Sequence, residues 1–212
     1  MSRQHDQSDG DPRELFAARH QPLTIAPDVA HVLAAAYGEP HRAYHNAAHI
    51  ADVLRWFDFV ADQAGWHDAS SVYLALVFHD AVYDPTRTDN EARSAELARA
   101  LVHAGDATTE LILLTARHGS IDPGSIGADA GHFLDCDMAI LGAPLAELDA
   151  YDAAIAAEYR HLPAEAFRAG RHRFLAKLHG RPHIFLTELF RSHLERAARA
   201  NLERMLARHP PP

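Results

Sequence analysis

The chain has 212 residues, and its 29 acidic and 20 basic side chains give a formal net charge of −9, which argues against a general nucleic-acid-binding protein. Its longest strongly apolar run has about seven residues, whereas a membrane span needs roughly 20. The start of the sequence lacks the pattern of a secretory signal, and a single cysteine, Cys136, excludes an internal disulfide framework. We therefore expect a cytoplasmic protein with neither a membrane partner nor a stable nucleic-acid complex.

The charge is unevenly distributed along the chain. Residues 1–159 hold 9 basic and 25 acidic side chains, a net charge of −16, whereas residues 160–212 hold 11 and 4, a net charge of +7. Two interpretations stay open: basic helices pack against acidic ones, or some of the cations face an anionic substrate. Arg173 and Lys177, one helical turn apart, are the candidates for the second role.

Apolar residues recur with helical period almost throughout the chain, and alternating strand patterns are absent. Glycines follow many of the periodic segments and prolines precede some of them, as at helix ends and starts. The polar residues 1–23 predict a flexible segment, followed by a folded domain over 24–209. We expect one all-α domain of about nine helices, over 27–37, 47–64, 69–80, 90–104, 107–118, 130–141, 145–161, 164–179 and 184–208.

The helix predicted over 47–64 carries the first candidate ligand. His49 falls in its first turn, at the edge of an apolar stripe. His45 precedes it by about one turn, and Asn46 is suited to cap the helix start. A lone histidine on such a face is usually a satisfied core residue, so His49 needs further ligands nearby to indicate a metal site.

The apolar run at 72–78 ends on two polar residues, His79 and Asp80. A polar pair at the inner end of a buried segment must find partners, because each unsatisfied group costs roughly 1–3 kcal/mol. The similar pair at 67–68 is different, since Asp68 is well placed to cap the next helix. Metal coordination is one way to satisfy His79 and Asp80.

The stretch "FLDCDMAILG" adds a carboxylate. Asp135 and Asp137 lie about 200° apart on a helix, and the apolar direction coincides with Asp137, so Asp135 points the opposite way. An unpaired carboxylate on an apolar face is costly or becomes protonated. Three helices thus offer two imidazoles and two carboxylates, which suit one divalent ion of the Mn, Ni, Zn, Fe, Co or Mg kind: His49, His79, Asp80 and Asp137.

The order His…His-Asp…Asp resembles the signature of the HD superfamily of metal-dependent phosphohydrolases, which are all-helical. Stretches similar to one cytoplasmic bacterial branch are spread over about 24–205. The resemblance implies the same four ligands. It leaves the substrate open, because the superfamily includes nucleotide phosphatases, cyclic-nucleotide hydrolases, pyrophosphatases and a few iron oxygenases. The stretches are "YHNAAH" (44–49), "FHDAVYD" (78–84), "NEARSA" (90–95), "DCDMAILG" (135–142) and "ERAARANL" (195–202).

Members of the superfamily that hold two metals draw further histidines from the intervening helices. Here the candidates are His103, His118 and His132. Only His118 shares a face with apolar residues, so we expect one metal, with His118 contacting a ligand or a phosphate. The Gly-Tyr-Pro motif of the cyclic-dinucleotide subgroup is missing, which argues against that substrate.

The resemblance implies hydrolysis of a nucleotide, another small phosphate ester or a pyrophosphate by a metal-activated water. Glu91 is the first candidate for the acid or base and Asp84 the second, although Glu91 equally suits a helix start. Tyr44 and Tyr83 are expected to pack. The candidate substrate-binding residues are His45, Asn46, Arg173 and Lys177.

Two other functions remain open from the sequence. The same ligands could hold iron and activate oxygen, as in the minority branch of the superfamily. The protein could also be a non-catalytic sensor whose metal stabilises the fold. The oxygenase branch tends to hold two irons and needs more histidine ligands than this sequence clearly provides.

Overall fold

The computed structural model describes residues 11–210, and all regular secondary structure in this range is helical. The predicted single all-α domain of about nine helices is confirmed. Three short 3-10 helices accompany the nine α-helices. The elements are η1 (Pro12–Phe16), α1 (Pro27–Tyr37), α2 (Ala47–Gln63), α3 (Ala69–Phe78), α4 (Asn90–Val102), α5 (Asp106–Thr115), η2 (Pro123–Ser125), α6 (Ala128–Met138), η3 (Ala139–Gly142), α7 (Leu145–Glu158), α8 (Ala164–His179) and α9 (Glu188–Arg208).

Two predicted caps begin the helices that lead into the candidate site. The side chain of Asn46 accepts hydrogen bonds from the backbone N–H groups of Ala48 and His49 at the start of α2. The side chain of Asp68 accepts from the N–H of Ser71 at the start of α3. Such caps satisfy donors that have no partner within the helix, and the first one fixes His49 in the opening turn of α2.

Several helix bounds differ from the sequence prediction: α5, α6 and α7 end at Thr115, Met138 and Glu158 rather than at 118, 141 and 161, and α9 begins at Glu188 rather than at 184. Two further ends change the placement of candidate residues. α3 ends at Phe78, and His79 is its C-cap residue, so Asp80 lies in the turn beyond. α4 ends at Val102, where His103 adopts the left-handed conformation with φ 51°. Gly105, the glycine that follows the helix predicted over 90–104, does not end α4 but is the N-cap of α5, because the left-handed residue that ends α4 comes two positions earlier.

The start of the folded domain also differs from the prediction, which placed it at residue 24. Phe16 is buried in the core, and the hydroxyl of Tyr73 donates to its backbone carbonyl at 2.6 Å. The segment containing η1 therefore packs with the domain. The rest of the segment predicted to be flexible, residues 1–10, lies outside the described residues.

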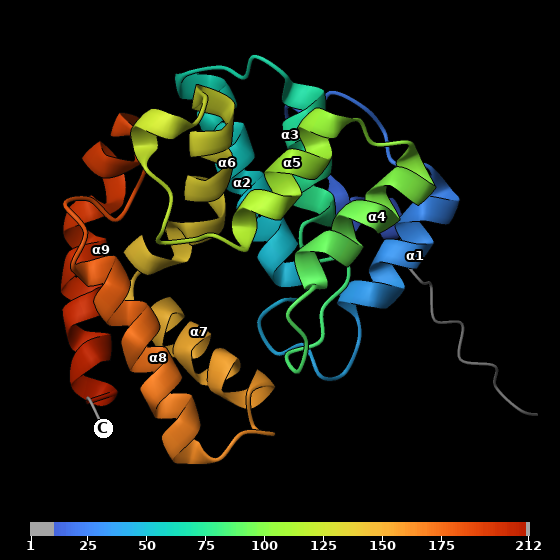
Figure 1. Cartoon of the computed structure of the whole chain (residues 1–212). Helices are drawn as coiled ribbons and strands as arrows, with labels where there is room; N and C mark the ends of the chain where they lie inside the picture. The colour runs from blue at the N-terminus through green and yellow to red at the C-terminus, as the bar shows by residue number, and fades with distance from the viewer. Residues whose placement is uncertain (1–10, 211–212) are drawn as a thin grey trace, which may run out of the picture.

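The helices place the candidate ligands at the centre of the molecule. α2 packs against α3 and α6, and α3 also packs against α4 and α5. In Figure 1 α1, α4 and α5 lie on one side of these inner helices, and α7, α8 and α9 lie on the other. α9 packs along α8 and against η3. Among residues 11–210, no helix has the length and apolar character of a membrane span.

Candidate metal centre

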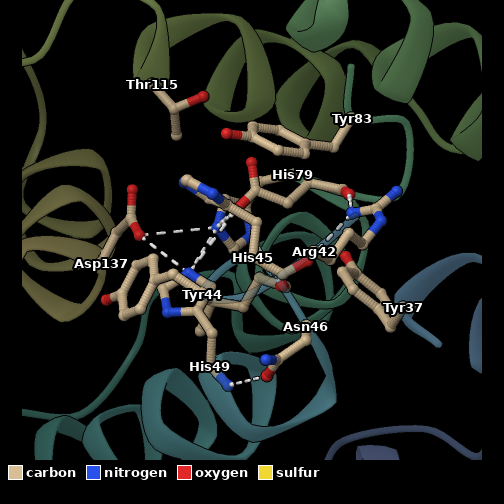
Figure 2. A network of polar contacts seen from close by, with 12 residues as sticks. Tyr37, Arg42, Tyr44, His45, Asn46, His49, His79, Tyr83, Thr115 and Asp137 are labelled. Atoms are coloured by element: carbon tan, nitrogen blue, oxygen red, sulfur yellow. Dashed lines mark hydrogen bonds and ion pairs between the residues drawn. The ribbon is translucent and has the colours of Figure 1, made fainter. Parts of the chain in front are cut away.

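Four side chains from α2, the end of α3 and α6 meet at one point, as the sequence predicted. The Nε2 atoms of His49 and His79 are 3.2 Å apart. Asp80 Oδ2 lies 3.6 and 3.1 Å from these two nitrogens, and Asp137 Oδ1 lies 3.2 and 3.5 Å from them. Figure 2 shows Asp137 reaching both imidazoles from the opposite helix. His49, His79 and Asp80 form a cluster that could hold a metal ion.

These spacings fit the ligands of a divalent ion. Ligand bonds of about 2.1 Å place adjacent ligand atoms roughly 3.0–3.4 Å apart in octahedral or tetrahedral geometry. Two imidazole nitrogens at 3.2 Å repel each other unless a proton or a cation lies between them. The two carboxylates supply the negative charge that a divalent cation needs. The donor set and its geometry therefore both fit a single divalent ion.

The charges of the cluster favour a bound cation. Burial disfavours a charged imidazolium at His79, but the carboxylates of Asp80 and Asp137 outweigh burial and raise its pKa well above its usual value. Burial likewise opposes the charge on Asp137, yet the His79 charge and hydrogen bonds from His118 hold its pKa well below the usual range. Without an ion, protons on the imidazoles balance the carboxylates, and a bound cation takes over that role.

Two hydrogen bonds orient the ligands. His79 Nδ1 donates to the carbonyl of Leu76 at 2.9 Å, which leaves its Nε2 free for the centre of the cluster. His118 Nε2 lies 2.7 Å from Asp137 Oδ2, so the other oxygen, Oδ1, faces the imidazoles. The predicted inward position of His118 is confirmed, and its partner is a candidate ligand.

Arg42 joins the segment before α2 to the turn that carries Asp80. Its side chain is buried, and its Nη1 donates to the carbonyls of His45 and Asp80 at 3.1 and 2.6 Å. Nη2 donates to the carbonyl of Ala81 at 3.1 Å, and Nε donates to Glu39. The guanidinium thereby fixes two segments that carry site residues. No sequence pattern indicates this role, because the carbonyls that Arg42 binds are backbone groups.

Glu158, at the end of α7, was also missed. Its fully buried carboxylate accepts hydrogen bonds from the backbone N–H groups of Tyr44 and His45, from His45 Nδ1 at 2.7 Å and from the Tyr83 hydroxyl at 2.8 Å. Burial opposes its charge, but these hydrogen bonds and the charge on His45 lower the pKa of Glu158 to about 2. More than a hundred residues separate Glu158 from His45, so no local motif pairs them.

His45 stands beside the candidate ligands. Its ring centroid lies 6.1 Å from that of His49, and Tyr83 stacks on it at 4.2 Å. Burial opposes its protonation, but the carboxylates of Asp80 and Glu158 outweigh burial and raise its pKa. Tyr83 therefore packs as expected and also supplies a polar contact, through its hydroxyl, to the carboxylate that holds His45.

Asp135 does point away from the metal cluster, as predicted, but it is buried as well. Its oxygens accept hydrogen bonds from the N–H groups of Leu186 and Thr187 at 2.7 and 2.8 Å, and from the Thr187 hydroxyl at 2.7 Å. Burial raises its pKa to about 6, although these hydrogen bonds oppose the shift. The hydrogen bonds of Asp135 join α6 to the start of α9. The two aspartates of "DCD" therefore belong to different sites, Asp137 to the metal cluster and Asp135 to this contact between helices.

The other predicted residues lie outside the cluster. None of the hydrogen bonds or ion pairs within residues 11–210 joins Glu91 or Asp84 to a candidate ligand, and Asp84 accepts from Thr86 in its own turn. Their catalytic roles stay predictions. Of the histidines considered for a second metal, His103 is exposed and His132 packs beside Trp66. His118 alone contacts the cluster.

The basic residues chosen from the sequence are on the surface. Arg173 and Lys177 are exposed on α8, and within the described range neither makes a side-chain hydrogen bond or ion pair. Asn46 contacts the backbone as a cap, and its amide donates to the carbonyl of Ala43. Their roles in substrate binding remain predictions.

Comparison with known proteins adds no assignment. No protein-family model, no curated protein and no solved structure matches this chain. The likeness to the HD superfamily therefore rests on the sequence motifs, and function has to be argued from the site.

Proposed function

We propose that this protein is a metal-dependent hydrolase of small phosphate esters or phosphoanhydrides, with nucleotides among the candidate substrates. The observation that supports the proposal is the convergence of His49, His79, Asp80 and Asp137 at spacings of 3.1–3.6 Å. Asp80 and Asp137 are also partly exposed, so the cluster can be reached from solvent. A cytoplasmic location remains a prediction from the sequence.

A divalent ion bound there supplies a Lewis acid for a phosphoryl oxygen and lowers the pKa of a bound water to about 7. His49 and His79 hold their Nε2 atoms toward the ion. Asp137 is kept in place by His118, and Asp80 by the Arg42 contact with its carbonyl. These supports keep the ligands in one orientation, which is the usual task of groups around a metal site.

His45 is the best placed group for moving a proton. Its Nδ1 is held by Glu158 at 2.7 Å, so Nε2 is the atom that gives or takes a proton. The side chain is 21% exposed, and it stands beside His49. A carboxylate that orients an imidazole is a common arrangement in general acid–base catalysis. This assigns to His45 the proton-transfer role that the sequence assigned first to Glu91.

The test combines metal analysis with a substrate screen. Purified protein should hold close to one divalent ion per chain, and chelation should abolish phosphate release from nucleoside monophosphates, p-nitrophenyl phosphate or pyrophosphate. His79→Ala should abolish both metal retention and turnover. Bound iron with oxygen consumption would favour the oxygenase alternative. Bound metal without any turnover would favour the non-catalytic one.

A further inference from the structure

A cavity of about 380 Å³ lies between α7 and α8, next to the candidate metal centre. His45 is one of its lining residues, so the cavity and the centre share this side chain. Its other walls are mostly aromatic or aliphatic: Tyr151, Ile155, Tyr159, Leu162, Phe167 and Phe174. The volume is within the range of small-molecule sites, which are typically apolar and carry few polar groups.

A chain of aromatic contacts links the cavity to the centre. The ring of Tyr44 lies 4.8 Å from that of His49 and 4.7 Å from that of Tyr151. The Arg171 guanidinium carbon is 4.9 Å from the Tyr151 ring centroid and 5.7 Å from that of Phe174. Each of these separations is a direct packing contact. Through Tyr44 and His45, the cavity lies one side chain away from the candidate ligand His49.

The charged groups of the cavity already have partners. Arg171 Nε donates to Asp152 Oδ1 at 3.1 Å, and His45 pairs with Glu158 at 2.7 Å. Each of these cations is thus already paired with a carboxylate, and among residues 11–210 the Arg171 Nη2 atom is a buried donor without a hydrogen-bond partner. Aromatic walls whose charged neighbours are already paired favour an uncharged planar ring. A nucleobase is such a ring, and any of the bases can stack on aromatic side chains.

Gly170 supplies an independent indication. It lies in the interior of α8, where glycine is less favourable than alanine. A Cβ built at this position meets nothing within 4 Å, and Gly170 lines the cavity. No close packing contact requires a glycine here, but its missing side chain keeps the cavity wall open.

We propose that this cavity binds the uncharged aromatic ring of the substrate, such as the base of a nucleotide, while the phosphate meets the metal centre. The placement of the substrate's phosphate at the metal centre rests on the proposed hydrolase function, whereas the binding of its ring in the cavity does not. Tyr159, Phe167 and Phe174 stack on the ring, and Arg171 holds Tyr151 and Phe174 in place. Nucleotides should therefore bind more tightly than sugar phosphates of the same charge that lack a base.

Substitutions at the cavity wall test the proposal. Gly170→Phe, and independently Ala166→Trp one turn earlier, narrow the cavity without touching a metal ligand, and Gly170→Ala is the matched control. We expect each large substitution to raise KM for adenosine 5′-monophosphate about 10-fold, the scale of one stacked base. KM for ribose 5-phosphate, metal content and the melting temperature should stay at the wild-type level.

Ligand-observed NMR with adenosine, which has no phosphate, separates this proposal from the hydrolase function. If no substrate is hydrolysed but adenosine binds wild type and Gly170→Ala, and not Gly170→Phe, the ring site stands and the hydrolase function fails. If KM values for adenosine 5′-monophosphate and ribose 5-phosphate are equal in wild type, or respond equally to the large substitutions, the ring site is wrong. Failure of adenosine to bind overturns it as well.

Discussion

Two of the buried polar clusters among residues 11–210 differ in the hydrogen-bonding groups that they lack. At the metal centre, two imidazoles and two carboxylates crowd together at 3.1–3.6 Å. Between α7, α8 and the end of α9, Asp152 accepts from Arg171 at 3.1 Å and lies 2.9 Å from His209 Nε2. Within residues 11–210, Arg171 Nη2 and His209 Nδ1 have no hydrogen-bond partner.

The comparison shows that burial alone does not identify a functional site. The first cluster combines two carboxylates with two imidazoles, so protons on the imidazoles or a bound cation balance its negative charge. The second cluster contains an ion pair and lacks acceptors, so each buried donor without a partner costs roughly 1–3 kcal/mol of unfolding free energy. A structural ion pair needs no ligand, whereas a cluster of imidazoles and carboxylates could hold a metal ion. We therefore expect substitutions in the two clusters to affect different measurable properties.

The largest contrast should come from Asp137→Asn and Arg171→Met. The first should reduce bound metal from about one ion per chain to almost none and abolish turnover, because a neutral amide is a poor ligand. The second should lower the melting temperature and leave metal content unchanged, because Arg171 contacts Asp152, Tyr151 and Phe174 and none of the candidate ligands. Elemental analysis and thermal melts measure both. Metal loss from both variants would show that the clusters are not separate.

Asp135→Asn is the matched control for Asp137→Asn. It should keep its metal, because its oxygens face Leu186 and Thr187. It should still lose about 1–3 kcal/mol of unfolding free energy, because one amide oxygen cannot accept from all three donors. Equal metal loss from the two variants would contradict the opposite orientations of these side chains.

A smaller effect is expected from Glu158→Gln. One carboxylate oxygen accepts from His45 Nδ1 and the Tyr83 hydroxyl, and the other accepts from the backbone N–H groups of Tyr44 and His45. The single amide oxygen can replace only one of the two, so the position of His45 is disturbed. Turnover should fall about 10–100-fold, the usual scale for residues that support a metal site, with metal content unchanged. The pH profile of kcat should shift as well. Glu158 raises the pKa of His45, so the loss of its charge should move the His45 limb of the profile to lower pH. Tyr83→Phe should reproduce part of the loss. An unchanged pH profile would leave Glu158 a purely structural role.

The pH dependence of stability should distinguish the metal-free and metal-loaded forms. The pKa of His79 in the folded state is raised above 6.5. Protonated His79 therefore stabilises the metal-free fold below that pH, and this stabilisation is lost as pH rises through the raised pKa. Metal-free protein should therefore lose stability above about pH 6.5. Metal-loaded protein should gain stability over the same interval, because protons no longer compete with the ion. Thermal melts with chelator and with manganese would test this, and identical slopes would contradict it.

The smallest effect is expected from Arg173→Ala combined with Lys177→Ala. Both side chains are exposed on α8, so stability should change by less than about 1 kcal/mol. If they meet a substrate phosphate, KM should rise, and the increase should be reduced at higher ionic strength because salt screens exposed charges. Kinetics at two salt concentrations would decide between the two interpretations of the basic segment, and an unchanged KM at both would leave it structural.

The sequence by itself determined the helical class, most helix bounds and the four converging side chains. Helical period places His49 and Asp137 on apolar faces, and an apolar run brings His79 and Asp80 to its inner end. These are local patterns, so they are readable without knowing how the helices pack. The same logic placed Asp135 on the opposite side of α6 from Asp137, although it could not show that this side is also buried.

Only the tertiary structure decided which groups support the ligands. Arg42 binds backbone carbonyls, and Glu158 reaches His45 across 113 positions of the chain, so neither leaves a local sequence pattern. The sequence singled out Arg173 and Lys177 among the basic residues of α8, whereas the structure buries Arg171 against Tyr151 and Asp152. Helical period gives the faces of one helix, but the partner of each face depends on packing between helices that are distant in sequence.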